Sequence, residues 1–221
     1  MTKLIWDKPD ERIFETGVSK GVLYPQVSGK YLKGVVWNGL TAVTESPEGA
    51  EPNPLYADNI KYLNLLSAED FKATVEAYTY PDEFAECNGE KSLVQGVTVG
   101  QQKRSPFGLC YQTKIGDAED SEKGYKINII YGALAAPSEK AYATVNDSPE
   151  AITFSWELST TPVEVTNAKP SAHLVIDTTK LGESASLDKL EEALYGTTDK
   201  EAWLPLPDEV VKLLDGTYVA G

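Results

Sequence analysis

Ser46-Pro47-Glu48-Gly49-Ala50-Glu51-Pro52-Asn53-Pro54-Leu55-Tyr56-Ala57-Asp58-Asn59 is the stretch from which the organisation of this chain can be worked out. It contains three prolines and no basic or β-branched residue. Proline lacks a backbone N–H and fixes φ, so we expect neither a ladder strand nor a helix interior here. A long connection without structure of its own is usually disordered or functional. Because this one carries Leu55 and Tyr56 near its end, an apolar pair suited to another surface, we expect it to contact a neighbour.

Strand-like sequence lies on both sides of this run. Residues 60–66 carry apolar side chains on both faces, which predicts a strand covered on both sides, by the core or by a partner. Residues 70–80 alternate between apolar and polar side chains, which predicts a half-buried strand. Turn clusters separate the remaining candidates, and this spacing indicates an antiparallel sandwich or barrel. Further strands are expected at residues 21–28, 35–44 (with a possible bulge at Gly39), 107–115, 126–131, 140–145 and 151–158, and a short helix at residues 81–88.

The two ends of the chain differ in character from its middle. Residues 1–30 are polar, with isolated apolar pairs such as the one that includes Trp6, and predict an extended N-terminal arm. Residues 170–221 predict a strand over 171–177, a helix over 186–195 with a leucine stripe, and a second short helix over 207–214. We therefore expect a single domain, residues 1–221, with a mainly β (α+β) fold. It is an antiparallel β-sandwich or half-barrel with a flanking short helix, a long inter-strand loop and extended terminal arms.

Composition limits what the protein can do. The 221 residues are 41% hydrophobic, enough for a core, and no apolar run approaches the roughly 20 residues of a membrane helix. The first residues lack the apolar segment of a signal peptide, so we expect synthesis in the cytoplasm. The net charge of −14 argues against nucleic-acid binding, which needs clustered Lys and Arg, but lets nucleic acid pass without sticking. The simpler interpretation of this charge is solubility.

The residues that carry chemistry form no recognisable site. His173 is the single histidine and has no nucleophile motif around it, so we expect a satisfied structural or surface histidine. Cys87 and Cys110 lack metal spacing and are expected to be free core residues. Residues 117–122 could recruit Ca²⁺ but lack the EF-hand order, and a solvated acidic turn is preferred. We expect no enzyme, no cofactor and no metal.

The aromatic residues allow two interpretations. Four tryptophans and twelve tyrosines could form a carbohydrate-binding platform, or they could fill strands. Trp37 and Trp156 lie within strand patterns and favour the second interpretation. Trp6 lies in the expected arm, where a role in an interface is favoured.

Several segments together resemble the major tail proteins (tail-tube proteins) of long-tailed siphovirus bacteriophages, including the phi13-type members. The resemblance spans nearly the whole chain, and no single segment is specific alone. It is carried by residues 51–63, Tyr78-Thr79-Tyr80-Pro81-Asp82-Glu83-Phe84, Arg104-Ser105-Pro106-Phe107-Gly108-Leu109, Tyr131-Gly132-Ala133, Phe154-Ser155-Trp156-Glu157 and Leu204-Pro205-Leu206-Pro207.

The resemblance implies a structural virion protein. Six copies would form a ring, and rings would stack into a tail tube through which DNA leaves without specific binding. Implied partners are other copies of the chain, a tape-measure protein and tail terminator and initiator proteins, with no membrane. The protein would be located in the virion tail, and in the host cytoplasm during assembly. The alternative is a monomeric β-sandwich that binds carbohydrate or peptide.

The resemblance also assigns residues 45–59 to a contact between rings. Residues 47–54 would be a stiff spacer, and residues 55–59 the docking tip and the return to the sheet. The expected inter-subunit contact residues are Pro47, Pro52, Pro54, Leu55, Tyr56, Asp58 and Asn59, together with Trp6 from the arm.

Overall fold

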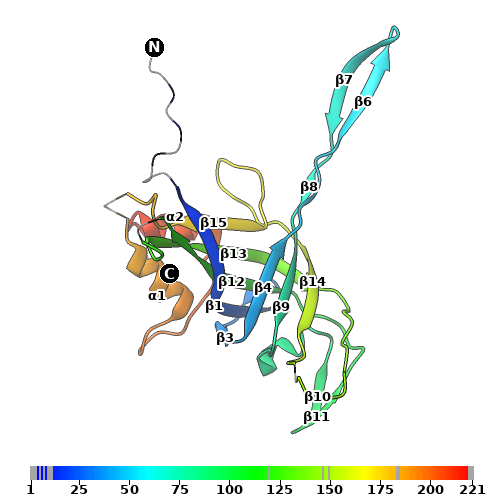
Figure 1. The fold of residues 1–221 in the computed structure, drawn as a ribbon, viewed down its shortest axis with the longest axis vertical. Helices are drawn as coiled ribbons and strands as arrows, with labels where there is room; N and C mark the ends of the chain where they lie inside the picture. The colour runs from blue at the N-terminus through cyan, green and yellow to red at the C-terminus, as the bar shows by residue number, and fades with distance from the viewer. Residues whose placement is uncertain are drawn as a thin grey trace.

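The computed structural model describes Leu4, Trp6, Lys8 and residues 12–118, 120–145, 147–148, 150–182 and 185–218. The chain is mostly β, with 44% of its residues in strands and 10% in helices. The expected mainly β fold is therefore confirmed. One large antiparallel sheet makes the body, and two helices lie against it (Figure 1).

The sheet is built around β12 (Phe107–Gly116) and β13 (Gly124–Ala135), which pair in antiparallel register. Both are rich in β-branched and aromatic residues, and β12 is buried on both faces over its first six residues. β1 (Phe14–Val27) pairs with the other edge of β12. Beyond β13 lie β15 (His173–Asp177) and β14 (Phe154–Thr160), which pair with different parts of that strand.

The sheet then curls back on itself. It continues from β14 to β9 (Lys72–Ala77) and then to β4 (Leu40–Glu45). β4 lies beside β1, but the described residues of these two strands form no hydrogen-bonded ladder with each other. β2 (Lys30–Tyr31) and β3 (Val35–Trp37) pair with the C-terminal part of β1. The result is the half-barrel form of the expected fold.

Aromatic rings fill the inside of the curl. The Phe84 ring is central, with its centroid 4.6 Å from that of Trp37 and 5.1 Å from that of Trp156. Phe84 comes from the 3-10 helix η2 (Asp82–Phe84), which is shorter than the helix expected over residues 81–88. Even so, Phe84 and Cys87 are both buried, as the sequence predicts.

The opposite face of the sheet is covered by α1 (Leu187–Tyr195) and α2 (Pro207–Leu214) (Figure 1). Leu190 and Leu194 are buried from the predicted leucine stripe. The buried Tyr131 hydroxyl donates to the Pro205 carbonyl at 2.9 Å, which fastens the segment before α2 to the sheet. The predicted C-terminal strand and both predicted helices are thus confirmed.

Three two-stranded ladders stand outside the sheet. β5 (Glu48–Gly49) pairs with β8 (Glu69–Asp70), and β6 (Pro52–Ala57) pairs with β7 (Ile60–Leu66). These two ladders form one projection, residues 46–70, which we call the long hairpin. β10 (Lys91–Val94) and β11 (Val97–Val99) form the short hairpin, residues 91–99, at the opposite end of the molecule (Figure 1).

The structure corrects the expectation that residues 46–59 are a loop without strand structure. Pro52 and Pro54 lie in β6, opposite Leu66 and Asn64. In a two-stranded ribbon, each strand has one edge without a neighbouring strand. A residue whose backbone nitrogen faces that free edge donates no hydrogen bond to the ladder, so it can be proline. Two prolines that are two residues apart share one orientation, so both can be tolerated.

Three other expectations are corrected. Residues 1–30 are not an arm throughout, because β1 occupies residues 14–27 in the sheet and its end is buried around Leu23 and Tyr24; Pro25 falls near the end of that strand. Residues 35–44 form two strands that separate at Gly39, where φ is +78°. The segment 140–145 has no strand, and its described side chains are largely exposed, so nothing there selects strand pairing.

Candidate assembly interface

The long hairpin is the part of this structure that contributes no strand to the large sheet and projects away from it. Its turn consists of Asp58 and Asn59, both with positive φ (50° and 62°), as a two-residue type I′ turn requires. The thirteen residues from Ser46 to Asp58 can reach at most about 43 Å, at about 3.3 Å per residue. The hairpin therefore projects far from the sheet (Figure 1).

Apolar side chains lie on both faces of this projection. Every residue of β6 and β7 is exposed within the chain. An isolated two-stranded hairpin is marginally stable in water, and contiguous exposed apolar surface marks an interaction site. The core therefore does not cover residues 60–66, and cover by a partner remains a prediction. The large exposed apolar side chains are Leu55, Tyr56, Ile60, Tyr62, Leu63, Leu65 and Leu66.

The root of the hairpin is held by side chains from three strands of the body. Glu45 ends β4 and Phe71 directly precedes β9, so these residues mark the two points where the hairpin leaves the sheet. The Tyr111 hydroxyl donates to Glu45 Oε1 at 2.9 Å. The His173 ring stacks on Phe71, with centroids 4.4 Å apart and planes 25° apart. These contacts fix where the hairpin starts but do not extend along it.

His173 packs at the root of the long hairpin, but its side chain is incompletely satisfied, whereas the sequence predicts a satisfied histidine. Its Nε2 lies 3.5 Å from Glu45 Oε1 and has no hydrogen-bond partner in the part of the chain that the structure describes. Burial lowers the pKa of the imidazole below its ordinary value, and the nearby Glu45 carboxylate opposes that shift. The ring is therefore mostly neutral at pH 7 and acts here by packing.

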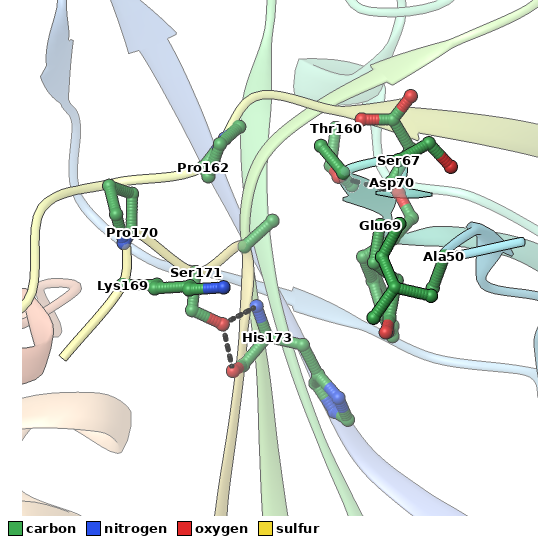
Figure 2. Close-up of a pocket in the computed structure, with 14 residues that line it drawn as sticks. Ala50, Ser67, Glu69, Asp70, Thr160, Pro162, Lys169, Pro170, Ser171 and His173 are labelled. Carbon is green, nitrogen blue, oxygen red and sulfur yellow. Dashed lines mark hydrogen bonds between the residues drawn. The ribbon is translucent and has the colours of Figure 1, made fainter. Parts of the chain in front are cut away.

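A cleft of about 840 Å³ lies beside the root. Figure 2 shows Ala50, Glu69 and Asp70 on one side, Lys169 and Pro170 on the other, and His173 below them. The size is within the usual range for ligand pockets, about 300–1,000 Å³. Among the lining residues only Phe71 and His173 carry aromatic rings, so the cleft offers little aromatic surface.

The structure brings together most of the contact residues expected from the sequence. Pro52, Pro54, Leu55 and Tyr56 lie on β6, and Asp58 and Asn59 form the turn. Pro47 precedes β5 at the base. Trp6 is exposed, and no hydrogen bond or ring contact among the described residues joins it to the long hairpin. Strand pairing occurs in both the expected spacer, residues 47–54, and the expected tip, residues 55–59, and their separate roles stay a prediction.

Sequence reasoning missed the short hairpin. Its signal was present, because Val94 and Val97 flank a two-residue turn that contains Gly96, with φ of +80°. Leu93, Val94 and Val97 are exposed.

The described residues hold little that suggests catalysis. Among them no group of three or more His, Cys, Asp or Glu side chains could hold a metal ion. In the 117–122 turn, Asp117 Oδ1 accepts from the Asp120 N–H and Oδ2 pairs with Lys123, so this carboxylate is engaged within the turn; Glu119 lies outside the described residues. Cys87 and Cys110 are free and buried, and burial raises the pKa of each thiol to about 12.

No family model matches the chain, and no curated protein matches it either. None of the described helices has the length and apolar character needed to cross a bilayer.

Proposed function

We propose that this chain is a structural subunit of a phage tail tube, in which six copies form a ring and the rings stack. The observation that carries the proposal is the outer part of the long hairpin, β6 and β7, which exposes large apolar side chains on both faces and has every residue exposed among the described residues. A surface of this kind is stable in water only when another surface covers it. The residue-level resemblance to tail-tube proteins supports the same role.

The shape of the projection favours stacking over a closed dimer. The hairpin extends from one end of the molecule, so it can reach a different surface on the next copy (Figure 1). Contacts between two different surfaces repeat without limit when rotation does not close them, and this produces filaments. The hairpin length limits the axial repeat to about 43 Å if the tip reaches the root level of the next copy.

The remaining parts of the proposal follow from charge and from the resemblance. A net charge of −14 would keep DNA from adhering to the tube wall during passage. The partners would be other copies of the chain, a tape-measure protein and tail terminator and initiator proteins. The protein would have no catalytic role and would be located in the virion tail, after assembly in the host cytoplasm.

Electron microscopy of the purified chain at rising concentration, alone and co-expressed with a tail initiator, tests this proposal. The control replaces residues 51–67 with Asn-Gly, which keeps the Gly49–Glu69 pair and closes the shortened hairpin with a type I′ turn. We expect tubes from the full chain, and only rings or monomers with unchanged thermal stability from the control. A full chain that stays monomeric with the initiator present would sink the proposal.

One observation favours the alternative, a monomeric module that binds carbohydrate or peptide. A groove of about 660 Å³ near α1 is lined by Trp203 and Tyr218, whose ring centroids lie 5.5 Å apart. Charged side chains, including Lys189 and Glu192, surround this pair. Glycan-array binding by a stable monomer, lost in Trp203→Ala, would favour this alternative over the tube.

A further inference from the structure

The short hairpin is the second uncovered apolar element of the described chain. The side chains of Leu93 and Val94 are each 63% exposed, and that of Val97 is 50% exposed. Its two strands pair only with each other. In Figure 1 it lies at the end of the long axis opposite the long hairpin, so the two hairpins of one chain cannot cover each other.

The short hairpin, taken together with the residues that follow it to Lys103, also differs in charge from the long hairpin. Residues 91–103 contain Lys91 and Lys103 and no acidic residue, in a chain whose net charge is −14. Neither lysine makes an ion pair within the described part of the chain. Residues 46–70 contain one lysine and five acids, namely Glu48, Glu51, Asp58, Glu69 and Asp70. A strongly acidic chain repels its own copies, so a local basic site marks where an acidic element can approach.

We propose that the short hairpin, with the residues that follow it to Lys103, is the acceptor for the long hairpin of a second copy of this chain. This contact rests on the proposed stacking and specifies the surface on which stacking occurs. Leu93, Val94 and Val97 cover part of the apolar face of the incoming ribbon, and Lys91 and Lys103 meet its carboxylates. Because donor and acceptor lie at opposite ends of one molecule, the contact is head-to-tail and repeats along an axis.

The cleft beside the hairpin root is a weaker candidate for the acceptor. Glu69 and Asp70 form one of its walls and would repel an acidic ribbon, and Lys169 is the only lysine in its lining. The cleft also has fewer exposed large aliphatic side chains than the short hairpin: Leu66, itself part of the long hairpin, is the single leucine, and there is no isoleucine or valine. Charge and apolar surface thus both favour the short hairpin.

A complementation experiment with two variants tests the contact. The donor variant has an inactivated long hairpin and carries Ile60→Asp and Tyr62→Asp. The acceptor variant has an inactivated short hairpin and carries Leu93→Asp and Val97→Asp. Each keeps one functional surface, so each alone is expected to stop at a single layer, a ring or a monomer. Mixed together, they can form one head-to-tail junction, after which both free ends are inactive.

We therefore expect the mixture to give complexes of two layers and no tubes, measured by mass photometry and electron microscopy. A chain with all four substitutions is the control and should form no junction with either variant. Two results would overturn the acceptor assignment: tubes from the acceptor variant at a concentration within about twofold of wild type, or no two-layer complex from the mixture while wild type forms tubes. A wild-type chain that forms no tubes would overturn the proposed function and this contact with it.

A charge test uses the two lysines of the acceptor. Lys91→Glu with Lys103→Glu should raise the concentration for half-maximal assembly by about three- to tenfold at low salt, since exposed ion pairs contribute little each. The difference should shrink at high salt. Lys189→Glu with Lys212→Glu makes the same change in net charge on the helices and is the matched control. An equal effect in the control would show that net charge alone matters and would refute the charge contact.

Discussion

Replacing Ile60 by Ser should weaken assembly strongly and leave the free subunit unchanged. The Ile60 side chain is 64% exposed in the free chain. Fully burying an isoleucine contributes about 1.5–3 kcal/mol, so covering this side chain in a stack is worth about 1–2 kcal/mol per contact. Since 1.4 kcal/mol is a factor of ten, the concentration for half-maximal assembly should rise by about 5- to 30-fold.

The stability of the free subunit should not respond to this substitution. Ile60 packs on nothing in the body, and the hairpin can fray without opening the sheet. Exposed substitutions of this kind usually change the free energy of unfolding by less than about 0.5 kcal/mol. Light scattering against protein concentration gives the assembly midpoint, and thermal unfolding followed by near-ultraviolet circular dichroism gives the subunit stability.

Val211→Ser is the matched control, because Val211 is an exposed β-branched residue on the outer side of α2. It should shift the assembly midpoint by less than about twofold. The reasoning fails if Ile60→Ser assembles like wild type, if it lowers the melting temperature of the subunit by several degrees, or if Val211→Ser weakens assembly equally. The last result would mean that any loss of apolar surface suffices.

Phe84→Ala should lower the free energy of unfolding in urea by about 3–5 kcal/mol, because it removes a fully buried ring that contacts other aromatic rings; a loss under 1 kcal/mol would contradict the central place of this ring. Stability should fall as the pH drops from neutral through the ordinary histidine range, because the pKa of buried His173 is lowered and the unfolded chain binds the extra proton first. His173→Phe should make the free energy of unfolding less dependent on pH in this range, even with Glu45 in place. An equal pH dependence in wild type and in His173→Phe would count against His173 as its cause. Cys87 and Cys110 should resist a thiol reagent at pH 8 in the native chain and react on unfolding, since burial raises both pKa values to about 12; rapid native labelling would show that the core opens readily.

Much of the body could be predicted because local pattern and burial agree there. In residues 70–80 the alternation of small apolar and polar side chains predicts one buried face, and Ala73, Val75 and Ala77 are indeed buried. The leucine stripe of α1 likewise gives both the helix and its buried side. Each of these elements buries one face, so the spacing of its apolar residues indicates which side chains are buried.

The long hairpin shows where pattern reasoning fails. The prolines of β6 exclude a central strand correctly, but they do not exclude a ribbon with two free edges. Whether a strand lies in the centre of a sheet or in a two-stranded ribbon depends on how many strands pair with it. The sequence of a single segment does not determine how many strands pair with it. The sequence likewise predicts a strand only for the second half of β1, because the first half is exposed and carries no apolar alternation.

The sequence by itself determined that this chain is acidic, mainly β and without a recognisable catalytic motif, and that residues 46–66 carry more apolar surface than a connecting segment needs. These properties depend on composition and on spacing over a few residues. Only the tertiary structure decided that this surface stands away from the body, that His173 and Glu45 meet at its root, and that a basic hairpin lies at the opposite end. Such relations join residues far apart in the chain, and they arise from how the sheet curls.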